Sequence, residues 1–103
     1  MNLRGTLPTL ILEAIERHPD HGYSIAQGIK ERSSGVLDFK EGTLYPALHK
    51  LEMEGAVESY EGIEKGRGRR YYRITKAGRA ELAKGRREWS QVSHAVTLIL
   101  KGV

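Results

Sequence analysis

The spacing of apolar residues changes at Gly55, and this change limits the fold more than any other feature of the sequence. Before Gly55, apolar residues recur every three or four positions, which is the spacing of helices that bury one face. After it, residues 56–60 and 70–74 are rich in β-branched and aromatic residues, as strands are. The segment 61–69 between them holds three glycines, so we expect a two-stranded hairpin with a long, mobile tip.

Two helical patterns open the chain. The apolar stripe of the first consists of Leu7, Leu10, Ile11, Ala14 and Ile15. Thr6 is the expected N-cap of this helix. The second helix is expected over residues 22–32, where Gly28 costs about 1 kcal/mol relative to alanine and so predicts a close helix crossing.

A third helical pattern follows the connector 33–40 and ends at Gly55, which stands at the position after a helix where glycine is preferred. Its apolar stripe consists of Leu44, Ala47, Leu48 and Leu51. Pro46 is tolerated only near a helix start, so Thr43 is the expected N-cap, or the helix begins a residue or two earlier.

A fourth helix is expected from Thr75, as its N-cap, towards Leu100. Its apolar or small residues alternate at spacings of three and four, which is the period of a helix that packs on another helix. These residues are Leu82, Gly85, Trp89, Val92, Val96 and Ile99. We predict dimerisation through five of them: Leu82, Trp89, Val92, Val96 and Ile99.

The predicted class is therefore mainly α with a small β-hairpin, in the element order of a winged helix-turn-helix followed by a long C-terminal helix. We divide the chain into a DNA-binding domain over residues 1–75 and a dimerisation helix over residues 76–103. A length of 103 residues is small for a self-sufficient core, which also favours oligomerisation.

Basic residues are concentrated in one segment. Between Lys65 and Arg87 there are ten lysines or arginines and one acid, Glu81, whereas the rest of the chain holds seven basic and twelve acidic residues. A basic segment on an acidic body is typical of a surface that binds nucleic acid. A basic helix and loop that are merely solvated remain the other interpretation.

Several classes of protein are not expected. The sequence has no cysteine, and Pro19 separates His18 from His21, so neither a metal site nor a cofactor is predicted. No nucleophile stands at a useful spacing from a base, so an enzyme is not expected. No apolar run approaches the roughly 20 residues of a membrane span. We expect a soluble cytoplasmic protein.

The third helix and the hairpin are expected to make different kinds of contact with DNA, and together they supply the candidate DNA-binding residues. The third helix would enter the major groove, and the hairpin lysines and arginines would neutralise phosphates. The candidates are Tyr23, Thr43, Tyr45, Pro46, His49, Lys50, Lys65, Arg67, Arg69 and Arg70. Tyr71 and Tyr72 are expected to pack within the hairpin, because cross-strand aromatic pairs stabilise it.

Four segments together resemble the PadR family of transcriptional regulators. They are Gly5-Thr6-Leu7, His21-Gly22-Tyr23, the run from Glu41 to Glu52, and the run from Arg70 to Gly78. The resemblance covers roughly residues 5–85 and implies a dimeric winged-helix repressor released from a double-stranded operator by a small, often aromatic, molecule. With a single helix after the hairpin, the chain is similar to the short subfamily, whose members dimerise through that helix.

Two questions remain open from the sequence. Trp89 is either an aromatic anchor in the dimer interface, or it also flanks a cavity for a flat hydrophobic effector, with Gly85 leaving room. The second question is the function itself, since the alternative is a winged-helix module that binds a protein partner and no DNA.

The two-fold symmetry of a dimer predicts a roughly palindromic operator.

Overall fold

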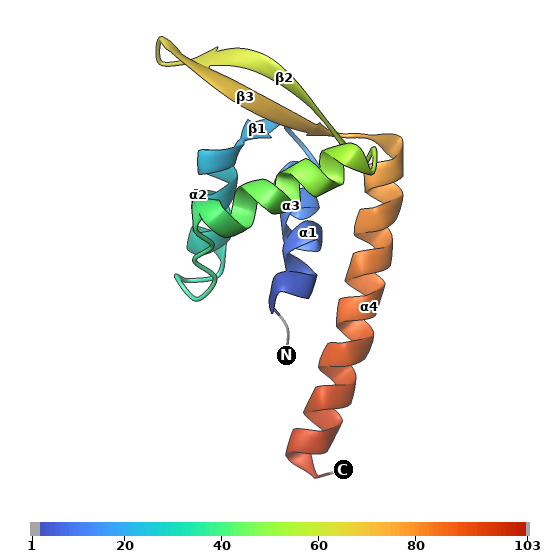
Figure 1. Cartoon of the computed structure of the whole chain (residues 1–103). Coiled ribbons are helices and arrows are strands. Elements are labelled where there is room, and N and C mark those ends of the chain that lie inside the picture. The colour runs from blue at the N-terminus through green and yellow to red at the C-terminus, as the bar shows by residue number, and fades with distance from the viewer. Residues whose placement is uncertain (1–2, 103) are drawn as a thin grey trace.

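Four helices and a small antiparallel sheet make up the fold in the computed structural model, which describes residues 3–102 and the side chains of residues 5–102 (Figure 1). The elements are α1 (Leu3–Ala14), β1 (Asp20–His21), α2 (Gly22–Arg32), α3 (Glu41–Met53), β2 (Val57–Glu64), β3 (Arg67–Ile74) and α4 (Lys76–Lys101). The predicted class and element order are confirmed, with one added strand, β1. The outer ends of the proposed division, at residues 1 and 103, lie outside the described part of the chain.

The core lies where α1, α2 and α3 meet the base of the sheet and the first turns of α4. Its buried side chains come from every helix and from β2 and β3. They include Leu7, Ile11, Leu12, Ile15, Ile25, Ile29, Leu44, Leu48, Leu51, Val57, Tyr72 and Leu82. The stripes predicted for the first and third helices are therefore the faces that hold the molecule together.

Two helices begin earlier than expected. α1 includes Leu3, so Thr6 is not its N-cap, and α3 begins at Glu41 after the N-cap Lys40. α3 therefore begins three residues earlier than a helix capped by Thr43 would, one residue more than the alternative allowed. Pro46 is the sixth residue of α3, so the helix lacks one backbone hydrogen bond near its start. An apolar stripe identifies the buried face of a helix, but it does not fix the first residue.

The hairpin has no long loop, and this expectation was wrong. β2 and β3 pair in register from Val57 with Ile74 to Glu64 with Arg67, so only two residues connect them. Lys65 and Gly66 form that turn with φ values of 52° and 75°, the left-handed pair that matches the twist of a two-residue hairpin. We call residues 57–74 the wing, and Figure 1 shows it extending past α2.

Aromatic packing within the wing is confirmed. The rings of Tyr60 and Tyr71 stack at 5.6 Å between centroids, and Tyr72 is buried in the core. A methyl group built at Gly62 would lie 2.6 Å from the Tyr71 ring, so the absence of a side chain there lets the ring lie across the strand. The glycine that suggested a loop is instead part of the strand packing.

Gly28 does not mark a helix crossing, because nothing lies within 4 Å of a methyl group built there. The close approaches occur on α4. A methyl group at Gly78 would lie 2.0 Å from the Ala56 carbonyl oxygen, and one at Gly85 would lie 2.1 Å from Thr9 Oγ1. Thr9 therefore packs directly against the backbone of Gly85.

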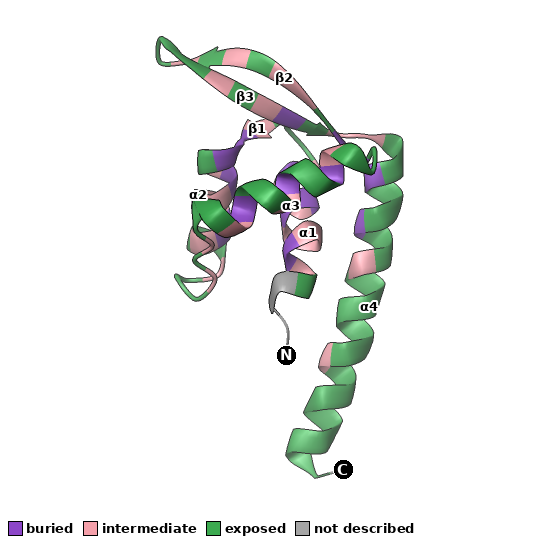
Figure 2. Ribbon diagram, in the orientation of Figure 1, coloured by how far each residue is buried: buried purple, intermediate pink, exposed green. Residues whose placement is uncertain are grey.

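The first turns of α4 belong to the core, whereas the rest of the helix extends away from it (Figure 2). Thr75 caps the helix by accepting a hydrogen bond from the Gly78 amide at 3.0 Å, as predicted. Leu82 is 1% exposed in the core of its own chain and has no free surface for a partner, which corrects its assignment to the predicted dimer interface. Within residues 3–102, no helix has the length and apolar character that a bilayer crossing requires.

Candidate nucleic-acid interface

α3 presents a solvent-exposed face opposite its buried leucines. Tyr45, Pro46, His49 and Lys50 are exposed on it, while Thr43 lies half-buried on one flank. Met53, which the sequence did not single out as a site residue, is 76% exposed on the same face. The helix therefore offers hydroxyl, imidazole and ammonium groups together with an apolar side chain, which is the range of chemistry that reads base edges.

The wing carries its basic residues in two different environments. Lys65 and Arg67 are exposed at the turn and form no ion pair with another described residue. Arg69 is half-buried, and its Nε finds no hydrogen-bond partner in the described part of the chain. The turn is therefore the part of the wing with cations free to meet phosphates.

Arg70 is held by neighbouring side chains. Its Nη1 donates to Ser59 Oγ at 2.7 Å, and its Nη2 pairs with Glu61 Oε1 at 3.1 Å. Ser59 in turn donates to a carboxylate oxygen of Glu52 on α3. A continuous polar chain thus joins the exposed helix to both strands of the wing, and Arg70 belongs to that chain.

Tyr72 lies beside this chain with its ring in the core. Burial, and after it the Glu52 carboxylate, raises the pKa of the Tyr72 hydroxyl above its ordinary value. A tyrosine hydroxyl is already protonated at neutral pH, and this rise in pKa extends the neutral form to higher pH, so no negative charge develops beneath the exposed face of α3.

The start of α2 is fixed by His21. Its Nδ1 accepts a hydrogen bond from the Ser24 amide at 3.3 Å, and its Nε2 lies 2.5 Å from Glu64 Oε2. An imidazole that accepts at Nδ1 carries its proton on Nε2, so it donates to the carboxylate. His21 thereby caps α2 and ties it to the far end of β2. Tyr23, in the first turn of α2, is 59% exposed.

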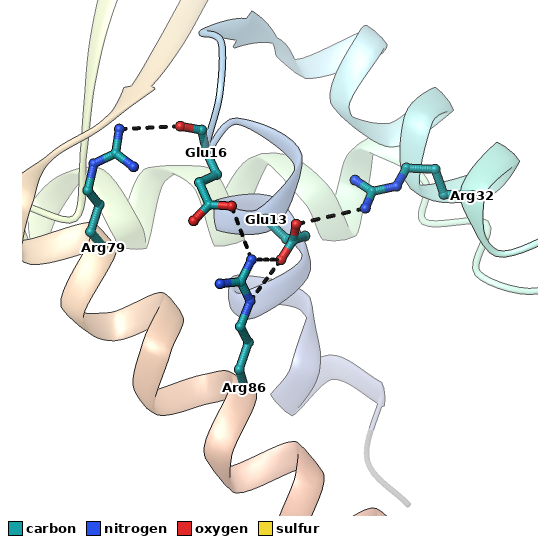
Figure 3. A network of polar contacts seen from close by, with 5 residues as sticks. All are labelled: Glu13, Glu16, Arg32, Arg79 and Arg86. Atoms are coloured by element: carbon teal, nitrogen blue, oxygen red, sulfur yellow. Dashed lines mark hydrogen bonds and ion pairs between the residues drawn. The ribbon is translucent and has the colours of Figure 1, made fainter.

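An ion-pair cluster joins α4 to α1 and α2 (Figure 3). Arg86 Nε donates to Glu13 Oε1 at 3.0 Å, and its Nη2 pairs with Glu16 at 3.1 Å. Arg32 approaches Glu13 at 3.8 Å, and Arg79 donates to the Glu16 carbonyl oxygen at 3.3 Å. Glu13, and after it Glu16, raises the pKa of the Arg86 guanidinium, which stays charged. The cluster adds polar contacts to the packing of α4 on α1 and links it to the end of α2.

A cavity of about 540 Å³ opens beside this cluster, between α1 and α4. Apolar side chains from both helices and from the α2–α3 connector dominate its walls. The lining residues are Gly5, Thr6, Thr9, Leu10, Glu13, Leu37, Gly85, Arg86, Glu88, Trp89 and Val92. It is large enough for a small molecule, and its chemistry favours an apolar one.

Comparison with known proteins decides the family. The profile of the transcriptional regulator PadR-like family matches residues 11–84. The chain belongs to the PadR-like family. It is therefore a DNA-binding transcriptional regulator and not an enzyme.

Individual relatives of this PadR-like regulator agree with that assignment. It is 40% identical over 76 residues to the transcriptional regulator Rv3488 of Mycobacterium tuberculosis, covering 74% of this chain and 68% of the other. A transcriptional regulator from Clostridium thermocellum matches with a TM-score of 0.85 and 33% identity, covering 92% of this chain and 90% of the other. A PadR family regulator from Clostridium difficile matches at 0.79 and 31%, covering 91% and 97%.

Sequence reasoning missed the residues that hold this interface together. Glu52 and Ser59 carry no signal of their own, because a glutamate on a helix and a serine on a strand are ordinary surface residues until the fold brings them together. Glu64 carries no signal either, although it binds a buried histidine 43 positions away in the sequence. In this PadR-like regulator the exposed residues were readable from the sequence, but their supports were not.

Proposed function

We propose that this PadR-like regulator is a cytoplasmic, dimeric repressor that binds a roughly palindromic operator and is released by a small aromatic or hydrophobic effector. The observation that carries the proposal is an apolar seam along the outer part of α4. Trp89, Val92, Val96 and Ile99 are 43%, 49%, 43% and 77% exposed, at the three-and-four spacing of a helix that pairs with another. We call these four residues the outer seam, and a second copy is its proposed partner.

The dimer is tested by changing the outer seam. Val92→Glu with Val96→Glu places two like charges in the proposed interface, and we expect a monomer in sedimentation velocity. Ser90→Glu with His94→Glu is the matched control, because both residues are exposed and lie four apart on the opposite face of the helix. A dimer that persists in the first variant would contradict the proposed interface.

In the proposed complex, each protomer lays α3 in a major groove and the wing against the flanking backbone. Thr43, Tyr45, Pro46, His49 and Lys50 are the proposed contacts of α3. Tyr23, Lys65, Arg67 and Arg69 are the proposed backbone contacts. We assign Arg70 to the support of the wing, because its guanidinium is already bound to Ser59 and Glu61.

Selection of DNA fragments by the purified protein tests this arrangement. We expect two inverted half-sites whose centres are one or two helical turns apart, about 34–36 Å per turn. His49→Ala should change the preferred bases of each half-site, since it removes a donor from the helix face. Equal losses of affinity on the selected and on random duplexes would contradict the assignment of α3 as the recognition helix.

The cavity between α1 and α4 is the proposed effector site. Trp89 and Val92 belong both to its lining and to the outer seam, so a bound ligand would alter how two copies meet. An effector shifts the equilibrium only if it prefers one arrangement of the dimer. Because Trp89 is the one tryptophan, its fluorescence reports binding directly. Planar aromatic probes should quench it and weaken operator binding, and an absence of quenching would contradict this part of the proposal.

A further inference from the structure

The side chain of Tyr45 on α3 rests against the first residue of α2. A methyl group built at Gly22 would lie 2.6 Å from the Tyr45 hydroxyl oxygen and 2.7 Å from Cε1 of its ring. These distances are well inside van der Waals contact, so the end of the Tyr45 ring occupies the space that a side chain at position 22 would need. Gly22 is itself buried beneath the ring.

Backbone geometry does not explain a glycine at this position. The glycines with positive φ in the described chain are Gly35, Gly55, Gly66 and Gly102, and Gly22 is not among them. Gly22 is the first residue of a regular helix, where alanine is accommodated and is the better helix former. The contact with Tyr45 is therefore the steric reason that the structure gives for the missing side chain.

The contact with Gly22 holds the Tyr45 hydroxyl in place on the candidate interface. Tyr45 is 41% exposed, and its hydroxyl forms no hydrogen bond with another described residue. The hydroxyl is held beside the N-terminus of α2. The exposed Tyr23 is the second residue of that helix. A hydroxyl fixed before binding loses less conformational freedom when it contacts DNA than one on a freely rotating ring.

We propose that Gly22 is a positioning residue for DNA binding. Its lack of a side chain lets Tyr45 lie against α2, and this contact sets where the Tyr45 hydroxyl meets the operator. The proposal rests on the proposed function, in which Tyr45 contacts DNA, and it adds a residue on another helix that makes no DNA contact of its own.

Gly22→Ala tests the proposal because the group that must move is the end of a side chain and not the backbone. We expect the affinity for the operator to fall by about three- to tenfold, the size of one displaced hydrogen bond. The slope of affinity against salt should stay unchanged, because no charge is removed. Gly28→Ala is the matched control, since it adds the same methyl group to α2 with nothing within 4 Å, and it should bind within twofold of the parent protein.

Tyr45→Ala completes a double-mutant cycle. Once the ring is gone, Gly22→Ala should cause no further loss, so the double variant should bind like Tyr45→Ala alone. Losses that add, or a Gly22→Ala variant that binds like the parent, would overturn the inference. If Gly22→Ala fails to fold, recovery of folding in the double variant supports the contact, and continued unfolding refutes it.

The cycle also separates this inference from the proposed function. A parent protein that binds no duplex in a salt-dependent way would refute the DNA-binding arrangement itself. Parent binding together with unimpaired binding by Tyr45→Ala would leave that arrangement in place and refute only the role of Tyr45 and Gly22.

Discussion

The arginines of the wing differ in what their guanidinium groups touch. Arg73 lies 4.7 Å from the centre of the Tyr60 ring and pairs with Glu58, and Arg70 is bound to Ser59 and Glu61. Arg67, at the turn, has no ion pair with another described residue. From the sequence these residues form one basic cluster. Because pairing depends on the strand register, only the structure distinguishes the free cation from the bound ones.

Arg67→Ala should weaken binding to every duplex alike. The loss of one phosphate contact should reduce the slope of log affinity against log salt by about one unit. The measurement is a salt titration of binding to operator and to random DNA. Arg87→Ala, an exposed arginine on α4, removes the same charge away from the interface and should leave the slope unchanged.

Arg70→Ala should behave differently, because Arg70 supports the wing. We expect it to lower the ratio of operator to random affinity and to match the effect of Ser59→Ala, since both break the chain to Glu52. The double variant should lose little more than either single one. Strictly additive losses in the binding assay would show that the two residues act separately.

Among the elements, the buried faces of the helices and the presence of the hairpin were predictable, whereas two helix starts and the two-residue turn of the wing were not. The stripes, the cap Thr75 and the end at Gly55 follow from local preferences, and the structure agrees with them. The glycines at 62, 66 and 68 suggested a loop because local composition does not include cross-strand packing. The short β1 was missed because two residues that pair only with β3 leave no periodic pattern. The exposed residues of α3 follow from its stripe, whereas Gly22 needed knowledge of how α2 and α3 meet.

Gly66→Ala should destabilise the wing, because Gly66 has a φ of 75°. An L-residue in this conformation costs about 1–2 kcal/mol. We expect a loss of that size in the free energy of unfolding measured with denaturant. Gly66→Asn should lose less, since asparagine tolerates the left-handed region better. Equal stability of the alanine variant and the parent would mean that the turn differs from the one described.

At the scale of the whole molecule, the direction of α4 links the cavity to the interface. The molecule measures 55 × 28 × 23 Å, and α4 extends well beyond the body that carries α3 and the wing (Figure 1). Arg86 belongs both to the cavity and to the ion-pair cluster, because it lines the cavity and pairs with Glu13 and Glu16. A ligand beside Arg86 therefore contacts the cluster that joins α4 to α1 and α2.

Arg86→Met should lower the melting temperature in low salt and have a smaller effect at about 1 M salt, where the Debye length falls to about 3 Å. The reason is that it leaves Glu13 and Glu16 close together without their shared cation. Arg87→Met is the control, since Arg87 neighbours Arg86 on the outside of α4. A salt-independent loss would indicate that Arg86 acts through packing.

Beyond Ser93 every described residue of α4 is exposed, so the last turns of this helix are not buried by the described part of their own chain. A helical segment shorter than about 12–15 residues is marginal in water when it stands alone. If two copies pair through the outer seam, as we propose, a single copy should fray along these turns on dilution, and dimer formation should restore the helix by mass action. The concentration of the regulator in its cell would then set how much of α4 is helical. Promoter occupancy would rise more steeply than in direct proportion to that concentration.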